Sequence, residues 1–306
     1  MIEAGLIFAR FLHFAAVMAL FGLALFPLYS GNPPLARLSR WLCASLWCSA
    51  LLALASALAW GWFTIAAMTG DMMGAGADSL LTVLRETSFG QVWVARLALL
   101  AGLLTLMRRR SHEQHPDWTI MLLAALLLAS LALVGHTNTS DGVLWIVHMS
   151  ADGAHLLAGG AWFGGLLALA YLLGLARCPS AEHTAHAITA LTRFSGMGYA
   201  AVAALIASGL VNAWVLVGSP RNLITTPYGQ LLLVKVCLLG GMLALAAQNR
   251  FRLVPALQRS KQGSMAAEAP LRVVRRNVLT EQTLALMIVL IVGWLGTLQP
   301  AVAASD

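Results

Sequence analysis

The chain has 306 residues, of which 59% are hydrophobic and only 10% are charged. Soluble globular domains carry about 25% charged residues, so this composition excludes a soluble protein covered by polar groups. The net charge of +7 does not indicate nucleic-acid binding, because the basic residues lie between long apolar segments and act there as topology determinants. Lipid is the expected solvent.

Eight apolar segments are long enough to cross a bilayer, which takes about 20 residues of helix. In chain order they cover residues 3–29, 41–68, 91–107, 119–135, 143–175, 194–217, 229–248 and 281–298. Backbone polar groups in hydrocarbon must be hydrogen-bonded internally, so each segment is predicted to be a helix. We expect an all-α polytopic membrane helix bundle of about eight transmembrane helices, forming a single transmembrane domain over residues 1–306.

The basic residues between the spans predict the orientation. The loops after the first, third, fifth and seventh spans hold 14 Lys and Arg, whereas the alternate loops hold only Arg85 and Arg221. Basic loops stay in the cytoplasm, so both termini are predicted to be periplasmic. The long basic loop at about residues 249–280 is expected to face anionic lipid on the cytoplasmic side.

Ionisable side chains inside the spans are the main functional signal, because they are costly in lipid and usually mark function. His148, Asp152 and His155 are spaced i, i+4 and i+7, so they share one helical face. A rise of about 1.5 Å per residue separates the two histidines by about 10 Å, too far for one metal ion. The pattern predicts successive ligand positions, with a polar face bonded to neighbouring helices as the alternative.

His13 in the first span lies at about the depth of His155, roughly 16–18 Å from the outer helix ends. We therefore predict that these two histidines approach each other and share one metal ion. Arg10 and Asp152 are also level, at about 13 Å, and are expected to pair. The alternative partners of the carboxylate are the other intramembrane cations, Arg96 and Lys235.

Three soft or borderline ligands lie in the predicted outer loops. Met72 and Met73 begin the loop at about residues 69–90, and His136 begins a second outer turn. Thioether sulfur suits Cu(I), and imidazole suits several transition metals. We predict that these side chains capture metal, with hydrophobic cover for the methionines and a solvated histidine as the alternatives.

The sequence lacks the motifs of several enzyme classes. It has no Walker A, Gly-x-Ser-x-Gly or His-Glu-x-x-His motif. We expect a protein that is not an enzyme.

Several segments resemble the copper resistance D (CopD) family of bacterial inner-membrane proteins. The most specific are the His155-to-Leu166 run with its His–Trp–Gly–Gly pattern and the Tyr228-to-Lys235 run. The others are Arg10-Phe11-Leu12-His13, Arg193-Phe194-Ser195, Ser208 to Ala213, Asn249-Arg250, and Arg276 with Glu281.

The resemblance implies a multi-pass protein of the bacterial inner membrane that handles copper, usually by copper uptake from the periplasm. It also implies a small periplasmic copper-binding partner of the CopC type. His13 and His155 lie in the matching motifs and are the implied copper ligands, whereas His148 and Asp152 rest on the spacing argument.

Two further functions are compatible with the sequence. A b-type haem or redox protein would use His13 and His155 as axial ligands, and its propionates would pair with the cations Arg10, Arg96 and Lys235. A scaffold would bind copper-handling partners without moving metal.

Overall fold

The computed structural model describes residues 1–31, 35–70, 77–109, 117–134, 142–176, 181–259 and 265–303. Over these ranges the chain is helical and has no strand. The elements are α1 (Ile2–Ser30), α2 (Ala36–Thr69), α3 (Ala77–Glu86), α4 (Ser88–Arg109), α5 (Trp118–Ala129), the 3-10 helix η1 (Ser130–Val134), α6 (Gly142–Leu175), α7 (Ala181–Val217), α8 (Pro220–Thr225), α9 (Pro227–Gln248), the π-helix η3 (Asn249–Leu253), α10 (Val254–Arg259) and α11 (Met265–Leu295).

The predicted fold class, a polytopic helical membrane bundle, is confirmed. In the described part of the chain seven helices are long and apolar enough to cross a membrane, and Trp118–Val134 is a shorter apolar helix. Its 12 α-helical and 5 3-10 residues extend about 28 Å, close to the hydrocarbon thickness of about 30 Å. All eight apolar segments therefore form helices.

Several helices are longer than the apolar segments that predict them. α7 begins at Ala181 rather than at residue 194, and α11 begins at Met265 rather than at 281. The predicted outer loop at 69–90 contains α3, which packs on α4 where Gly90 approaches the backbone of Val83 and Leu84. Hydropathy marks the part of a helix that lies in lipid, and polar helical ends extend beyond it.

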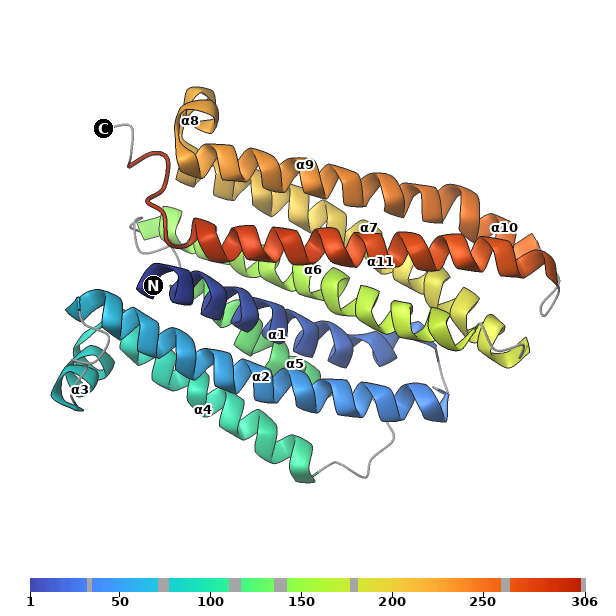
Figure 1. Cartoon of the computed structure of the whole chain (residues 1–306), viewed down its shortest axis with the longest axis horizontal. Coiled ribbons are helices and arrows are strands. Elements are labelled where there is room, and N and C mark those ends of the chain that lie inside the picture. The colour runs from blue at the N-terminus through green and yellow to red at the C-terminus, as the bar shows by residue number, and fades with distance from the viewer. Residues whose placement is uncertain are drawn as a thin grey trace.

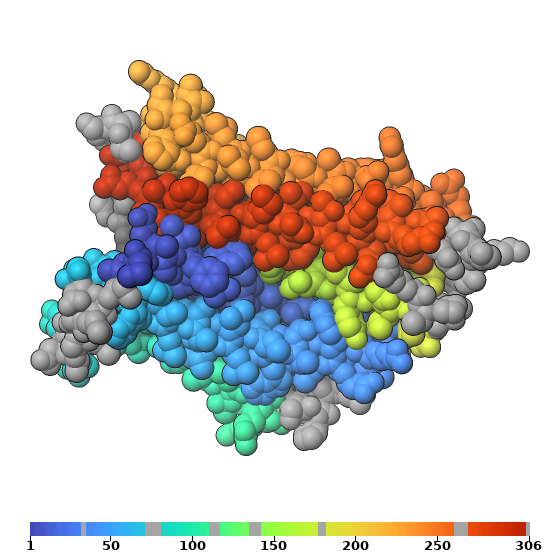
Figure 2. Space-filling view, in the orientation of Figure 1, coloured from blue at the N-terminus to red at the C-terminus, as the bar shows by residue number. Residues whose placement is uncertain are grey.

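The helices run side by side, and α1 begins at the end of the bundle where α11 finishes (Figure 1). An even number of crossings requires this arrangement. α1 packs against α2, α5, α6 and α11, and α6 packs against both α1 and α7. Figure 2 shows α11 between α9 and α1 on the face in view.

A close backbone approach joins α1 to α6. A Cβ atom added to Gly22 would lie 2.6 Å from the Cα of Gly164 and would also overlap the carbonyl oxygen of Gly160. Small residues spaced four apart let membrane helices approach in this way. The glycine-rich run after His155 therefore fixes α6 against α1.

α7 and α9 leave a space between them. α7 packs against α6 and α9 packs against α11, and over their described residues the two helices make no extensive contact with each other. This space contains the candidate site.

Candidate functional site

A cavity of about 550 Å³ lies inside the bundle between α6, α7, α9 and α11, with α1 closing one side. Its walls are mainly leucine, valine, isoleucine and phenylalanine side chains. A few polar side chains converge on it: Arg10, His148, Asp152, His155, Asn212, Tyr228 and Lys235. An apolar cavity with few convergent polar groups is the usual form of a small-ligand or substrate site.

The polar face predicted for α6 lines this cavity. His148, Asp152 and His155 all contribute to its wall, so the spacing identifies the helical face correctly. His148 is 1% exposed, and its Nδ1 has no hydrogen-bond partner among the described residues. Buried polar groups are normally hydrogen-bonded, so an imidazole without a partner is poised to accept a ligand.

His155 is held in one tautomer by Ser208 of α7. The Ser208 hydroxyl donates to the Ala204 carbonyl at 2.5 Å, so its oxygen accepts from Nδ1–H of His155 at 2.9 Å. Nε2 then carries a lone pair; the ring also interacts with the Leu205 carbonyl, which lies beside the Ser208 hydroxyl, and no other protein group among the described residues bonds to the ring. A partner on one ring nitrogen commonly orients a metal-binding histidine in this manner.

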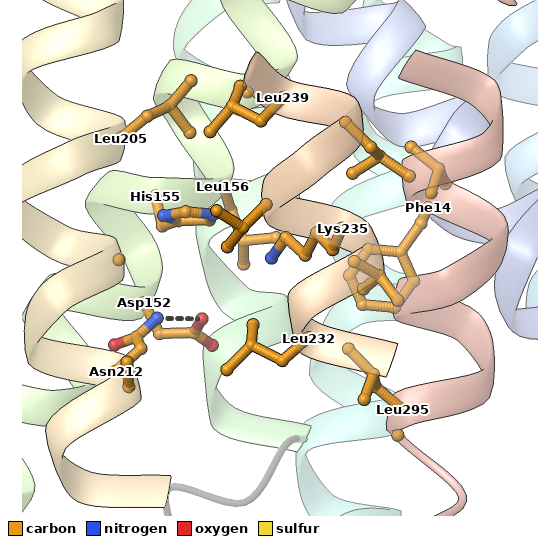
Figure 3. A pocket seen from close by; sticks show the side chains of 18 of the residues that line it. Phe14, Asp152, His155, Leu156, Leu205, Asn212, Leu232, Lys235, Leu239 and Leu295 are labelled. Carbon is orange, nitrogen blue, oxygen red and sulfur yellow. Dashed lines mark hydrogen bonds between the residues drawn. The ribbon is translucent and has the colours of Figure 1, made fainter. Parts of the chain in front are cut away.

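Asp152 interacts with α7 and α9 rather than with α1. Its carboxylate accepts from Nδ2 of Asn212 at 3.2 Å and interacts electrostatically with Lys235. Lys235 extends from α9 into the space beside His155 and Asp152 (Figure 3). The prediction that Arg10 pairs with Asp152 is wrong: the guanidinium lies over the Trp60 ring, with Cζ 4.8 Å from its centroid. Lys235, rather than Arg10, is the cation that interacts with the carboxylate of Asp152.

The segment that opens α9 positions Lys235. The hydroxyl of Thr226 accepts from the backbone N–H of Gly229 at 3.0 Å and caps the helix, whose first residue is Pro227. Tyr228 and Lys235 are seven residues apart, two helical turns, so both face the cavity. This local geometry explains the Thr-Pro-Tyr-Gly pattern.

His13 lies outside the cavity. Its Nδ1 is 3.1 Å from the Ala53 carbonyl and 3.2 Å from the Ser56 hydroxyl, and its Nε2 is 2.6 Å from Nη2 of Arg96. A guanidinium only donates, so Nε2 accepts and Nδ1 carries the proton. Both ring nitrogens are used by protein atoms.

The prediction that His13 and His155 share one ion is therefore wrong. His13 contacts α2 and α4 and lines a small separate pocket with Arg96, whereas His155 faces α7 and α9. Equal depth does not bring the two imidazoles to the same side of α1. The same geometry excludes this pair as the axial ligands of one haem.

Other predicted ligands fall outside this description. Met72, Met73 and His136 lie outside the described residues. Within those ranges no group of three His, Cys, Asp or Glu side chains could hold one metal ion. A thioether that the sequence analysis missed, that of Met18 on α1, lines the cavity.

A second polar cluster lies toward the other end of the bundle. Glu281 is 1% exposed and accepts from Nδ2 of Asn249 at 2.9 Å. Nδ2 of Asn277 donates to Oδ1 of Asn249 at 2.9 Å and to Gln248 at 2.8 Å. These contacts give a structural role to the Asn249 and Glu281 motifs, since they tie α11 to the start of η3.

Comparison with known proteins identifies the family. A model described as "Copper resistance protein D-like, N-terminal domain" matches residues 1–146, and one described as "Copper resistance protein D" matches residues 188–295. Copper resistance protein D of Pseudomonas syringae pv. tomato is 33% identical over 96% of both chains. The chain belongs to the copper resistance protein D family.

Further relatives agree with this assignment. Inner membrane protein YebZ of Escherichia coli K12 is 32% identical over 95% of this chain and 97% of its own length. Copper transport protein CutJ of Bacillus subtilis is 32% identical over 53% of this chain and 30% of its own length. No solved structure matches. These relatives and the seven long apolar helices make this copper resistance protein D family member a multi-pass inner membrane protein.

Proposed function

We propose that this protein handles copper in the inner membrane, taking it up from the periplasm to the cytoplasm through the cavity, and that it is a transporter rather than an enzyme. The observation that carries the proposal is the pair His148 and His155, which line one cavity, each with one ring nitrogen that has no hydrogen-bond partner among the described residues. Membership in the copper resistance protein D family and the name of Copper transport protein CutJ support copper as the ion.

The ligand chemistry favours a small number of contacts for each ion. Imidazole and thioether groups suit soft copper, and His148, His155 and Met18 supply them. The histidines are about 10 Å apart along α6, so each would serve its own position. Weakly held ions can be passed on, which suits transport better than storage.

The carboxylate of Asp152 offsets part of the positive charge in the cavity. The carboxylate of Asp152 lies beside His155 and offsets the ammonium of Lys235. Arg96 is only 3% exposed and is directed at His13 and the Leu127 carbonyl, outside the cavity. Arg96 therefore does not face the proposed path, whereas Arg10 and Lys235 do, together with the single carboxylate of Asp152.

The proposed direction follows from the bilayer. His148 and His155 lie in the half of α6 that is predicted to face the periplasm. A membrane potential contributes about 2.3 kcal/mol per charge per 100 mV, and an interior-negative potential draws a cation inward. A periplasmic copper-binding protein of the CopC type would deliver the ion.

The test is copper uptake by cells that express single and double His148→Leu and His155→Asn variants. Leucine removes the unpartnered Nδ1 of His148, whereas asparagine keeps a polar group near Nδ1 of His155, which bonds to Ser208, and removes its Nε2. We expect accumulation to fall on the order of tenfold, with normal amounts of protein in the membrane. The matched control is His13→Asn, which should keep uptake per folded protein. Native uptake by the double variant would overturn the proposal.

A further inference from the structure

The cavity is open on its lipid side. Leu210 and Ile206 of α7 and Val236 and Leu233 of α9 line the cavity and are also exposed on the surface of the bundle. Leu210 is 68% exposed and Val236 is 55% exposed. In a membrane these apolar side chains face hydrocarbon, so the gap between α7 and α9 connects the cavity to the bilayer interior.

The polar end of the cavity lies deep. Lys235, Asp152 and His155 are about 12, 15 and 20 Å from the outer ends of α9 and α6, counted at about 1.5 Å per residue. A phospholipid headgroup stays at the membrane interface and does not reach this depth. A ligand that enters from the side must therefore have a polar head that moves within hydrocarbon.

The polar groups at this end include both hydrogen-bond donors and acceptors. Lys235 offers an ammonium, while Nε2 of His155 and Oδ1 of Asn212 have no hydrogen-bond partner among the described residues. A ligand whose oxygens accept in one state and donate in the other satisfies both kinds of group. A quinone has two carbonyl acceptors, and its quinol has two hydroxyl donors.

We propose that the cavity binds a lipid-soluble quinone or quinol. The ring lies between His155, Asp152 and Lys235, with a carbonyl accepting from the ammonium or a quinol hydroxyl donating to Nε2 of His155. The isoprenoid tail leaves between Leu210 and Val236 into the bilayer. A volume of about 550 Å³ lies in the usual range for a bound organic molecule, about 300–1,000 Å³. This binding does not depend on copper transport.

The first measurement is binding of decylubiquinone to metal-free purified protein in lipid nanodiscs. Trp60 and Trp162 line the cavity, so a bound quinone quenches their fluorescence in a saturable manner. We expect Lys235→Met to weaken this saturable binding on the order of tenfold. Phe substitutions at both Leu210 and Val236 should narrow the lipid side and weaken it similarly.

The control is Phe substitution at both Leu122 and Leu126 of α5, which are exposed to lipid but do not line the cavity. These changes should leave binding unchanged. If Lys235→Met does not fold, the Phe substitutions at Leu210 and Val236 still test the proposal. Equal quenching in all variants would show only partitioning into the bilayer and would overturn the proposal.

A second measurement separates the ligand sources. Organic extracts of the purified protein should contain quinone close to one equivalent, reduced by the Leu210 and Val236 substitutions. A stoichiometric phospholipid that decylubiquinone does not displace would overturn the proposal. A saturable quinone site in a protein that does not move copper would support this inference while refuting the transport proposal.

Discussion

Nη2 of Arg96 donates to Nε2 of His13 across 2.6 Å and so joins α4 to α1 inside the bundle. Nη1 of the same guanidinium donates to the Leu127 carbonyl at 2.9 Å and to the Ser130 hydroxyl at 2.5 Å. Trp60 and Trp93 flank the imidazole. This arrangement is a structural network of α1, α2, α4 and α5, in which both ring nitrogens of His13 are used, whereas His148 and His155 of α6 each keep one ring nitrogen without a partner among the described residues.

His13→Ala should therefore lower stability rather than copper binding. The substitution removes an acceptor from a buried guanidinium, which costs about 1.5–3 kcal/mol. Thermal unfolding in detergent should show a clearly lower midpoint, with copper per folded protein unchanged. Loss of copper at native stability would contradict the structural role.

Ser208→Ala should impair copper binding through His155. Ser208 fixes Nδ1–H of His155 and leaves Nε2 available, and loss of such a partner typically costs 10–100-fold in metal affinity. Competition with a chromophoric Cu(I) chelator measures the change. Ser208→Thr keeps the hydroxyl and is the control; an equal loss in both variants would point to packing instead.

Gly164→Ala should destabilise the α1–α6 contact. The new methyl group would collide with the backbone of Gly22, at 2.5 Å from its Cα, and overpacking typically costs about 1–3 kcal/mol. The yield of folded protein and its unfolding temperature should both fall. Gly198→Ala on α7 meets nothing within 4 Å and should behave like the native protein.

The predicted orientation is tested by reporter fusions. Fusions after Arg110 and after Lys261 should report the cytoplasm, and a fusion near Asn138 should report the periplasm. The reason is the bias of 14 to 2 in loop Lys and Arg. A periplasmic signal at Lys261 would reverse the proposed direction of uptake.

The helices were predictable because hydropathy reports burial in lipid directly. The common face of His148, Asp152 and His155 was predictable because one helix fixes their relative directions. The separation of His13 from His155 was not predictable, since depth along a helix says nothing about rotation around it. Phe14 lines the cavity while His13, about 100° away around α1, faces α2 and α4.

The partners of the α6 face escaped the sequence analysis for a different reason. Ser208 and Asn212 are neutral, so they carry no cost signal in an apolar segment, although they stand four residues apart and meet His155 and Asp152. That i, i+4 spacing on α7 was the available clue. Met18 looks like any core side chain, and only the cavity reveals its sulfur as a candidate ligand.

The π-helix η3 has a consequence for how the chain tolerates changes in length. A π-helical turn accommodates an extra residue relative to an α-helix, so deleting one residue between Asn249 and Leu253 would let α9 run on regularly into α10. The residues beyond the deletion would keep the directions that they have now, because the π turn already absorbs the extra residue. Val254 and Leu257 would stay in the core, and Asn249 would keep its bond to Glu281. A single deletion inside η3 should thus be better tolerated than one in the regular turns of α9, which would rotate every residue beyond it by about 100°.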